Sequence, residues 1–316
     1  ELEKAMAGAK GDLSGTSGTQ NTIYLTDVGG IVAQDVITGA QRTIWKHPAG
    51  VTMAHEGHAG QATDASWRAC RQTSTRLWMV NLKTGQGYGT RAWGGVTDVS
   101  PSGRWVMTDV SGDGKPAIFY PIADIIAGTT TTQRLLPCAD SGHDGWTFGK
   151  DGKEYYLFQD NRNDWFSAWC PDTGERIDVI HYSELGWDYG QHMSVNIAPA
   201  ARGWFLMAAQ STTAATSWSH HQLMMIELKP AAQHPKIWRL GHNNVYSNGD
   251  KSVYYFAEGF ASLNPAGTRI WWGSNWNGTD NLNLYCMDLP DHWPSMLDAS
   301  PPAPTPTTSP SPTPTA

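Results

Sequence analysis

Residues 150–158 read Lys-Asp-Gly-Lys-Glu-Tyr-Tyr-Leu-Phe, a glycine turn followed by an apolar, aromatic run of the kind that forms a buried strand. The same unit recurs along the chain. Glycine turns at 100–103 (Ser-Pro-Ser-Gly), 199–203 (Pro-Ala-Ala-Arg-Gly) and 264–267 (Asn-Pro-Ala-Gly) each precede another apolar run. A turn-and-strand unit repeated in this way predicts a repeat architecture of short antiparallel strands.

A second glycine series interlocks with the first. Thr-Gly or Ala-Gly turns place Gly39, Gly85, Gly128 and Gly174 at steps of 43 to 46 residues. Two interlocked periods of this size are typical of an all-β β-propeller, in which each blade is a four-stranded sheet. A pair of β-sandwiches, the other all-β arrangement, would not carry one period so far along the chain.

We predict that the propeller spans residues 21–295. We count six blades, at residues 24–45, 66–93, 96–136, 143–180, 192–240 and 258–289. The segments 47–66 and 211–257 are long enough to hold further strands, so a seventh blade remains open.

Composition agrees with an all-β chain and excludes some partners. The 316 residues include 16 tryptophans and 33 glycines, and only 16% are charged, which favours strands and turns over helices. A net charge of −7 without a basic patch disfavours nucleic-acid binding. Since no 18-residue apolar run occurs, we expect no membrane span, and we expect a monomer.

The two ends of the chain differ from its middle. Residues 1–20 are rich in Gly, Ser and Ala and predict a flexible lead-in, whereas residues 296–316 are rich in Pro, Ser and Thr, with seven prolines in 300–316. Such a tail is an extended linker, of the kind that tethers a second module in secreted polysaccharide-acting proteins. We therefore expect secretion, and a plain disordered end or a glycosylated stalk remains the alternative.

Four cysteines, Cys70, Cys138, Cys170 and Cys286, lie far apart without a Cys-x-x-Cys pair. This spacing disfavours a zinc site and leaves one or two disulfides as the expectation.

Two histidines occupy matched positions in consecutive blades. His143, in Ser-Gly-His-Asp-Gly-Trp at 141–146, and His192, in Gly-Gln-His-Met-Ser at 190–194, each begin a predicted innermost strand. Because the starts of these strands converge around the central channel of a propeller, we expect the two imidazoles to meet over one ligand. The alternative is that each is a structural hydrogen-bonding group between strands.

Several stretches resemble one known family. Gly-His-Asp-Gly-Trp-Thr-Phe-Gly-Lys-Asp-Gly at 142–152, the histidine motif at 190–194 with Arg-Gly-Trp at 202–204, and Ser-Leu-Asn-Pro-Ala-Gly-Thr-Arg-Ile-Trp-Trp-Gly-Ser-Asn-Trp at 262–276 are similar to oligogalacturonate-lyase-like β-propellers. The resemblance covers about residues 95–290. It implies seven blades and β-elimination on uronic-acid sugars, with a histidine base and a manganese ion held by histidines and a glutamine. By position, His143 is similar to the base and His192 to the first metal ligand.

The chain departs from that family where further histidine ligands are expected. Residues 257–262 read Ala-Glu-Gly-Phe-Ala-Ser. Phe260 cannot bind a metal, and Glu258 with His192 would supply too few ligands for a transition-metal site. We therefore predict no metal ligands. If a divalent cation binds, calcium fits better than manganese. One place for calcium is Asp-Asn-Arg-Asn-Asp at 160–164, although such a run is more often a polar turn.

β-Elimination needs a neutralised carboxylate, a base for the α-proton and an acid for the leaving oxygen. We predict His143 as the base with His192 as its partner and Tyr189 as the acid. Three arginines are candidates for a bidentate carboxylate clamp, Arg71, Arg162 and Arg202, and we group Arg202 with the catalytic residues. Further residues are expected to bind the substrate: Arg71, Arg162, Gln191, Trp146, Trp187, Glu258 and His58.

A second function class uses the aromatic residues. Six tryptophans fall in or beside predicted turns and insertions, where exposed indole faces would stack on sugar rings: Trp146, Trp165, Trp187, Trp218, Trp276 and Trp293. The sequence thus predicts a secreted, polysaccharide-active propeller, most simply a lyase, with a non-catalytic carbohydrate-binding propeller as the alternative. A structural scaffold has no feature in its favour beyond the fold.

Overall fold

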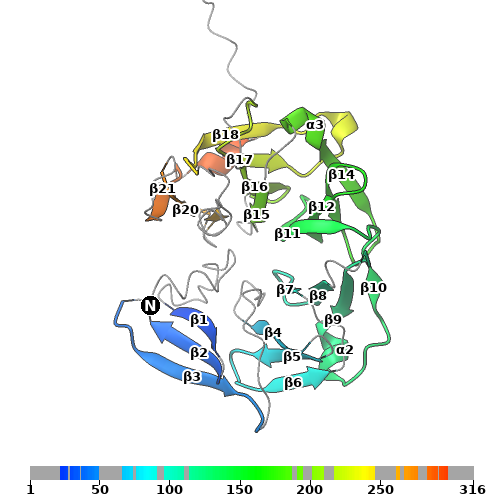
Figure 1. Cartoon of the computed structure of the whole chain (residues 1–316), viewed down its shortest axis with the longest axis vertical. Coiled ribbons are helices and arrows are strands. Elements are labelled where there is room, and N and C mark those ends of the chain that lie inside the picture. The colour runs from blue at the N-terminus through cyan, green and yellow to red at the C-terminus, as the bar shows by residue number, and fades with distance from the viewer. Residues whose placement is uncertain are drawn as a thin grey trace, which may run out of the picture.

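The computed structural model describes residues 22–27, 29–35, 37–49, 66–73, 76–90, 96–109, 114–186, 191–194, 201–209, 217–245, 261–263, 267–276, 283–290 and 292–297. These residues form a β-propeller. Six small antiparallel sheets follow one another around a ring, in the order of the chain (Figure 1). The prediction of an all-β propeller is confirmed.

Each described sheet corresponds to one predicted blade. The first two contain β1 (Thr22–Asp27), β2 (Gly30–Asp35) and β3 (Gln41–Lys46), then β4 (Trp67–Thr73), β5 (Arg76–Asn81) and β6 (Gly87–Thr90). The third contains β7 (Val96–Val99), β8 (Trp105–Asp109), β9 (Ile118–Pro121) and β10 (Arg134–Leu135). The fourth contains β11 (Ser141–Phe148), β12 (Glu154–Asp160), β13 (Trp165–Trp169) and β14 (Arg176–His181). The fifth contains β15 (Gln191–Ser194), β16 (Trp204–Ala209), β17 (Gln222–Glu227) and β18 (Ile237–His242), and the sixth β19 (Ser262–Leu263), β20 (Arg269–Ser274) and β21 (Asn283–Asp288). The number of blades in the whole ring stays a prediction, because the described residues exclude 50–65 and 246–260.

Both glycine series lie at turns between strands. Gly39, Gly85, Gly128 and Gly174 have φ of 72°, 72°, 75° and 76°, and the glycines that precede the apolar runs, Gly103, Gly152, Gly203 and Gly267, have φ of 71°, 79°, 84° and 69°. Since residues with a Cβ rarely adopt these angles, glycine is favoured at each turn. The glycine spacing that repeats in the sequence is therefore the spacing of turns whose glycine has a left-handed backbone conformation.

The hydrophobic core is divided among the gaps between neighbouring sheets. Separate clusters join the first sheet to the second, the second to the third, and so on to the sixth. The cluster between the third and fourth sheets is mainly aromatic: the Phe119 ring lies edge-on to Trp146, Tyr156 and Trp169, with centroids 4.9 to 5.8 Å apart. Burial of this apolar surface between sheets holds consecutive blades face to face.

Helical segments are few and short among the described residues: α2 (Ile122–Ile126), α3 (Tyr182–Leu185), η2 (Ala231–Gln233) and α5 (Trp293–Leu297). In the part of the chain that the structure describes, no helix is long and apolar enough to cross a membrane. The helix α5 covers the fifth and sixth sheets with Trp293 and Leu297, which are both buried. The predicted lead-in, residues 1–20, and residues 298–316 of the predicted linker lie outside the described residues.

The expected disulfides are not present. None of the four cysteines forms a disulfide. Cys70, Cys138 and Cys170 are buried in three different inter-blade clusters, and Cys286 is exposed on β21. The reason is topological, because each cysteine belongs to a different gap or face of the ring.

Candidate functional site

The two predicted histidines lie on neighbouring inner strands. His143 belongs to β11 and His192 to β15, the first strands of the fourth and fifth sheets. The two strands come so close at Gly145 that a Cβ there would lie only 3.0 Å from the Met193 carbonyl oxygen. Glycine at position 145 therefore permits the two inner strands to approach closely. The side chain of His192 lies outside the described residues.

His143 and Asp144 form a β-bulge. Gly142 pairs with Gln159 and Gly145 pairs with Leu157, so two residues of β11 stand opposite one residue of β12. The φ of His143 is 35°, which is uncommon for a residue with a side chain. A bulge redirects side chains and is often found next to active sites. The sequence predicted the histidine but not this conformation.

The carboxylate of Asp144 is held in place by a hydrogen bond from a buried tyrosine. The hydroxyl of Tyr156 donates a hydrogen bond of 2.6 Å to its Oδ2 atom. Tyr156 is 1% exposed, and its ring packs against Phe119 and Trp146. The carboxylate beside His143 is thus oriented by a buried group. Sequence reasoning missed both Asp144 and Tyr156; the only signal was the aspartate that follows the histidine in the motif.

Trp146 does not present an exposed ring, contrary to the expectation. It is 0% exposed and lies edge-on to Phe119 and Tyr156 in the cluster between the third and fourth sheets. The inner-strand alternation turns this indole toward the neighbouring blade rather than toward a ligand, so we withdraw it as a substrate-binding residue.

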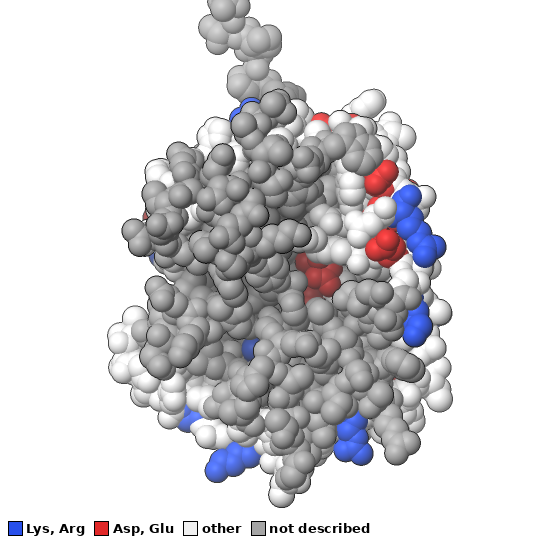
Figure 2. All heavy atoms as spheres, in the orientation of Figure 1, with Lys and Arg blue, Asp and Glu red and all other residues white. Residues whose placement is uncertain are grey.

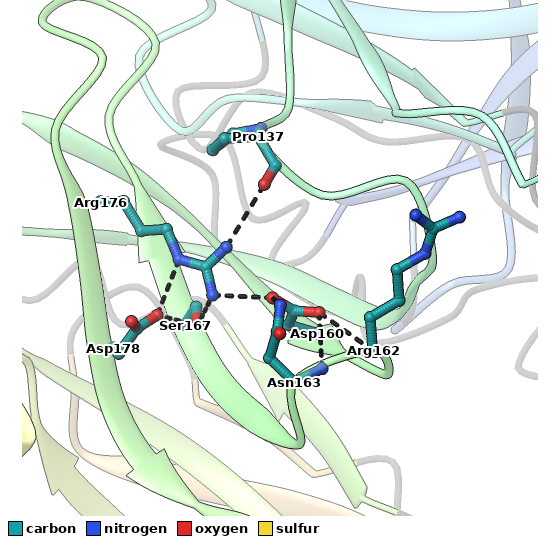
Figure 3. Close-up of polar contacts among 7 residues, drawn as sticks. All are labelled: Pro137, Asp160, Arg162, Asn163, Ser167, Arg176 and Asp178. Carbon is teal, nitrogen blue, oxygen red and sulfur yellow. Dashed lines mark hydrogen bonds and ion pairs between the residues drawn. The ribbon is translucent and has the colours of Figure 1, made fainter.

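One end of the fourth sheet carries the bulge, and we call the face of the ring at this end the bulge face. Since Ser141 pairs with Asp160, the turn 161–164 between β12 and β13 also lies on this face. Arg162 is in this turn and is exposed. Its guanidinium extends away from the polar cluster beside it (Figure 3). Arg162 therefore lies at the same mouth of the ring as His143.

A buried ion pair holds the Arg162 turn. Asp160 Oδ1 accepts hydrogen bonds from the backbone N–H groups of Arg162 and Asn163, at 3.1 and 3.2 Å. Its Oδ2 accepts one from the Asn163 amide, 2.9 Å, and pairs with Arg176 at 2.7 Å (Figure 3). Burial raises the pKa of Asp160, but the hydrogen bonds from Asn163, Arg176 and Cys138 outweigh it, so the pKa lies below its ordinary value. With its carboxylate so occupied, the run 160–164 is a polar turn rather than a calcium loop.

Arg202 lies at the opposite face. Its guanidinium stacks over the Phe148 ring at 5.1 Å, and Phe148 ends β11 five residues after His143. At the rise of an extended strand, that separation is about 15 Å. Arg202 therefore cannot act with His143 on one sugar ring, because the β15–β16 connection runs along the far end of the inner strands.

The remaining predicted site residues are only partly placed. Arg71 lies on β4 and Gln191 on β15, but their side chains are outside the described residues. Four others are outside them altogether: Tyr189, Trp187, Glu258 and His58. Their predicted roles stay predictions.

The centre of the ring contains acidic side chains. Figure 2 shows a central hollow with acidic side-chain atoms within it and with basic side-chain atoms visible below it in this view. Among the described inner strands β7, β11 and β15, the acidic residues are Asp98 and Asp144, both half-buried. Within the described residues, no three His, Cys, Asp or Glu side chains converge as metal ligands. An anionic sugar would therefore need a cationic group beside these carboxylates, and Arg162 is one described, exposed candidate on the bulge face.

Comparison with known proteins identifies the fold. No family model and no curated protein matches the sequence. Among solved structures, oligogalacturonate lyase in complex with manganese is similar over 87% of this chain and 76% of that chain, with a TM-score of 0.57 and 16% identity. Hydrazine synthase from Kuenenia stuttgartiensis is similar over 90% of this chain and 78% of that chain, with a TM-score of 0.56 and 14% identity. The class that these likenesses define is the β-propeller, a fold that serves unrelated chemistries.

Within that class, the oligogalacturonate lyases recur. The enzyme from Vibrio parahaemolyticus has a TM-score of 0.58 and 13% identity, over 88% of this chain and 77% of that chain. At this identity the likeness establishes the fold and not membership of the lyase family.

Proposed function

We propose that this propeller cleaves a uronic-acid polysaccharide by β-elimination, with His143 as the base. The observation that carries the proposal is the bulge, which sets His143 in a left-handed conformation beside an oriented carboxylate on an inner strand. Residues in disfavoured backbone conformations cluster at active sites and ligand clamps. The structural likeness to oligogalacturonate lyases supports the same reaction class.

The proposed reaction breaks one C–H and one C–O bond. The neutral imidazole of His143 takes the proton from the sugar carbon next to the carboxylate. The electron pair of that C–H bond forms the new carbon–carbon double bond, and the glycosidic oxygen on the next carbon leaves. Tyr189 is the proposed acid that protonates the leaving oxygen, and His192 is the proposed partner of the base.

Arg162 is the proposed carboxylate-binding group. It is exposed on the bulge face, and the Asp160 carboxylate fixes its backbone. A guanidinium can hold a carboxylate through two parallel hydrogen bonds, which lowers the cost of the carbanion character that develops next to that carboxylate. Arg162 would also offset the charge of Asp144, since otherwise two carboxylates would repel each other at short range.

A manganese ion is implied by the family resemblance, but the described residues do not supply its ligands. We therefore route no step through a metal. We further propose that the protein acts outside the cell as a monomer on a polysaccharide, with residues 298–316 as a linker.

The test is ultraviolet absorbance of the unsaturated product during incubation with polygalacturonate and alginate, with added calcium or manganese and with chelator. We expect His143→Ala to lower the rate by about a hundredfold or more without lowering the melting temperature. His292→Ala changes an exposed histidine on α5's N-terminal side and is the matched control. Activity of His143→Ala equal to wild type would remove the assignment.

A non-catalytic carbohydrate-binding propeller is the second candidate. It is favoured by one observation, the exposure of Trp218 and Trp276 at 42% and 46%. It predicts sugar binding that survives His143→Ala and no product absorbance with any substrate.

A further inference from the structure

We infer that Trp218 and Trp276 are two fixed sugar-binding platforms on the bulge face, which hold a polysaccharide chain outside the central site. The inference rests on the proposed function only for the class of sugar, a uronic-acid polymer. It requires three things of each indole: exposure, a fixed orientation, and a position on the same face as His143.

Trp218 is exposed but anchored. Its ring is 42% exposed, and its Nε1–H donates a hydrogen bond of 2.9 Å to the Glu184 carbonyl oxygen of α3. The hydroxyls of the two flanking residues, Ser217 and Ser219, both donate to the Leu185 carbonyl oxygen. The backbone and the ring edge are therefore tied to the same short helix, so that the ring face is presented to solvent in one orientation.

Trp276 is held by ring contacts and backbone hydrogen bonds. Its ring is 46% exposed and lies 4.9 Å from the Tyr285 ring, which in turn stacks on Trp272 at 5.9 Å. Its backbone N–H donates to Ser274 Oγ at 3.0 Å, and that hydroxyl donates to the Asn244 carbonyl oxygen at 2.9 Å. The φ of Trp276 is 42°. A row of three aromatic rings thus ends in an exposed indole whose backbone adopts a disfavoured angle.

Both tryptophans lie on the bulge face. Trp276 follows β20, the second strand of its sheet, and Trp218 lies between β16 and β17, the second and third strands of theirs. In the fifth sheet Gln191 pairs with Ala209, so the end of the second strand adjoins the start of the inner strand, as Asp160 adjoins Ser141. Every such connection leaves the ring at the end where His143 lies.

Hydrogen bonds between blades tie these connections together. The Asn243 amide donates to the Ala209 carbonyl oxygen at 2.7 Å, and Trp272 Nε1–H donates to the Asn243 carbonyl oxygen at 3.0 Å. The fifth and sixth sheets therefore present the two tryptophans on one connected surface.

A pyranose ring is the ligand that fits such platforms. Its axial C–H bonds form an apolar face that packs on an indole face, while its hydroxyls stay in water. Because the rings are already fixed, binding loses little rotamer entropy. The other exposed large apolar residues, among them Ile37 and Leu135, are aliphatic and have no such anchoring among the described contacts; isolated residues of this kind need no ligand to explain them.

The experiment is affinity electrophoresis through gels containing polygalacturonate, alginate or neutral xylan. We expect Trp218→Ala and Trp276→Ala each to weaken retention by one polymer about tenfold, and the double variant by about a hundredfold if the sites are independent. Leu135→Ala, which removes a side chain that is 51% exposed on the outer strand β10, should bind as wild type. Trp276→Phe keeps a ring over Tyr285 and should lose less than Trp276→Ala, and it serves if the alanine variant fails to fold.

A second readout separates this inference from the lyase proposal. If both hold, the tryptophan variants lose kcat/KM on the polymer but not on a trisaccharide, which spans only the central site. Loss of retention without any lyase activity would uphold the platforms and remove the lyase. Wild-type retention by the double variant would overturn the platforms. Failure of all three polymers to retain the wild-type protein would overturn them too. In either case the lyase assignment would depend only on the measured reaction rates.

Discussion

At the scale of single residues, Asp160 illustrates how one buried charge organises the candidate site. Its side chain is 1% exposed, and it accepts hydrogen bonds from the turn that carries Arg162 while it pairs with Arg176. Arg176 also pairs with Asp178 at 2.7 Å. The ion pair therefore links β12 to β14 and fixes the position of the exposed arginine that we propose as the carboxylate-binding group.

We predict that Asp160→Asn lowers the free energy of unfolding by about 2 kcal/mol at pH 7, because it removes a buried charged hydrogen-bond acceptor from Arg176. The pKa of Asp160 lies below its ordinary value of 3.8, so below about pH 4 the unfolded state takes up more protons than the folded state. This stabilisation is therefore present above pH 4 and lost as the pH falls. Urea unfolding at pH 7, 5 and 3.5 measures it, and a difference from wild type that does not shrink with acid would contradict the assignment.

Whether the role of a residue could be predicted depends on whether that role is determined by the nearby sequence or by distant parts of the fold. His143 could be singled out because its place at the start of a strand is local information. The burial of Trp146 and the position of Arg202 at the far face depend on the neighbouring blade and on strand direction. The Tyr156–Asp144 hydrogen bond joins two strands through a bulge, which the sequence does not mark.

At the scale of elements, the turns are the most predictable feature of the molecule. The eight predicted turn glycines all have φ between 69° and 84°. Because the left-handed region is closed to most side chains for reasons internal to one residue, the positions of these turns can be read from the sequence without knowledge of the rest of the fold.

We predict that Gly174→Ala, in the turn between β13 and β14, lowers the free energy of unfolding by about 1 kcal/mol. A Cβ at this position would meet no atom within 4 Å, so the cost would come from its φ of 76° alone. Gly241→Ala in β18 is the matched control, since it also meets nothing within 4 Å but does not have a left-handed φ. Thermal denaturation of the two variants compares them, and equal melting temperatures would count against backbone strain as the cause.

At the scale of the whole molecule, the hydrophobic core consists of separate clusters in the spaces between neighbouring sheets of the ring. Five clusters lie between consecutive described sheets, and α5 adds to the last of them. Trp293 of α5 is 5% exposed and donates its indole N–H to the Gly267 carbonyl oxygen. The segment after the last strand is thus part of the folded ring up to Leu297, two residues beyond the predicted end of the propeller.

We predict that Trp293→Ala lowers the free energy of unfolding by about 3 kcal/mol, because it leaves a cavity and an unpaired carbonyl between the last two sheets. Met296→Ala, at a position that is 44% exposed on the same helix, should change it by less than about 0.5 kcal/mol. Removal of residues 298–316 should leave the melting temperature unchanged. Differential scanning calorimetry distinguishes these variants, and a large effect of the tail deletion would show that the folded unit extends further.

The sequence by itself determined the class of fold, because apolar runs and left-handed glycine turns are local requirements that repeat with each blade. It also marked His143 and Arg162 as candidate site residues, and their roles stay predictions. Only the tertiary structure decided which predicted groups share a face of the ring, which tryptophans stay exposed, and that the cysteines remain apart. Those properties depend on the direction of each strand and on contacts between residues far apart in the chain, and a local pattern does not record them.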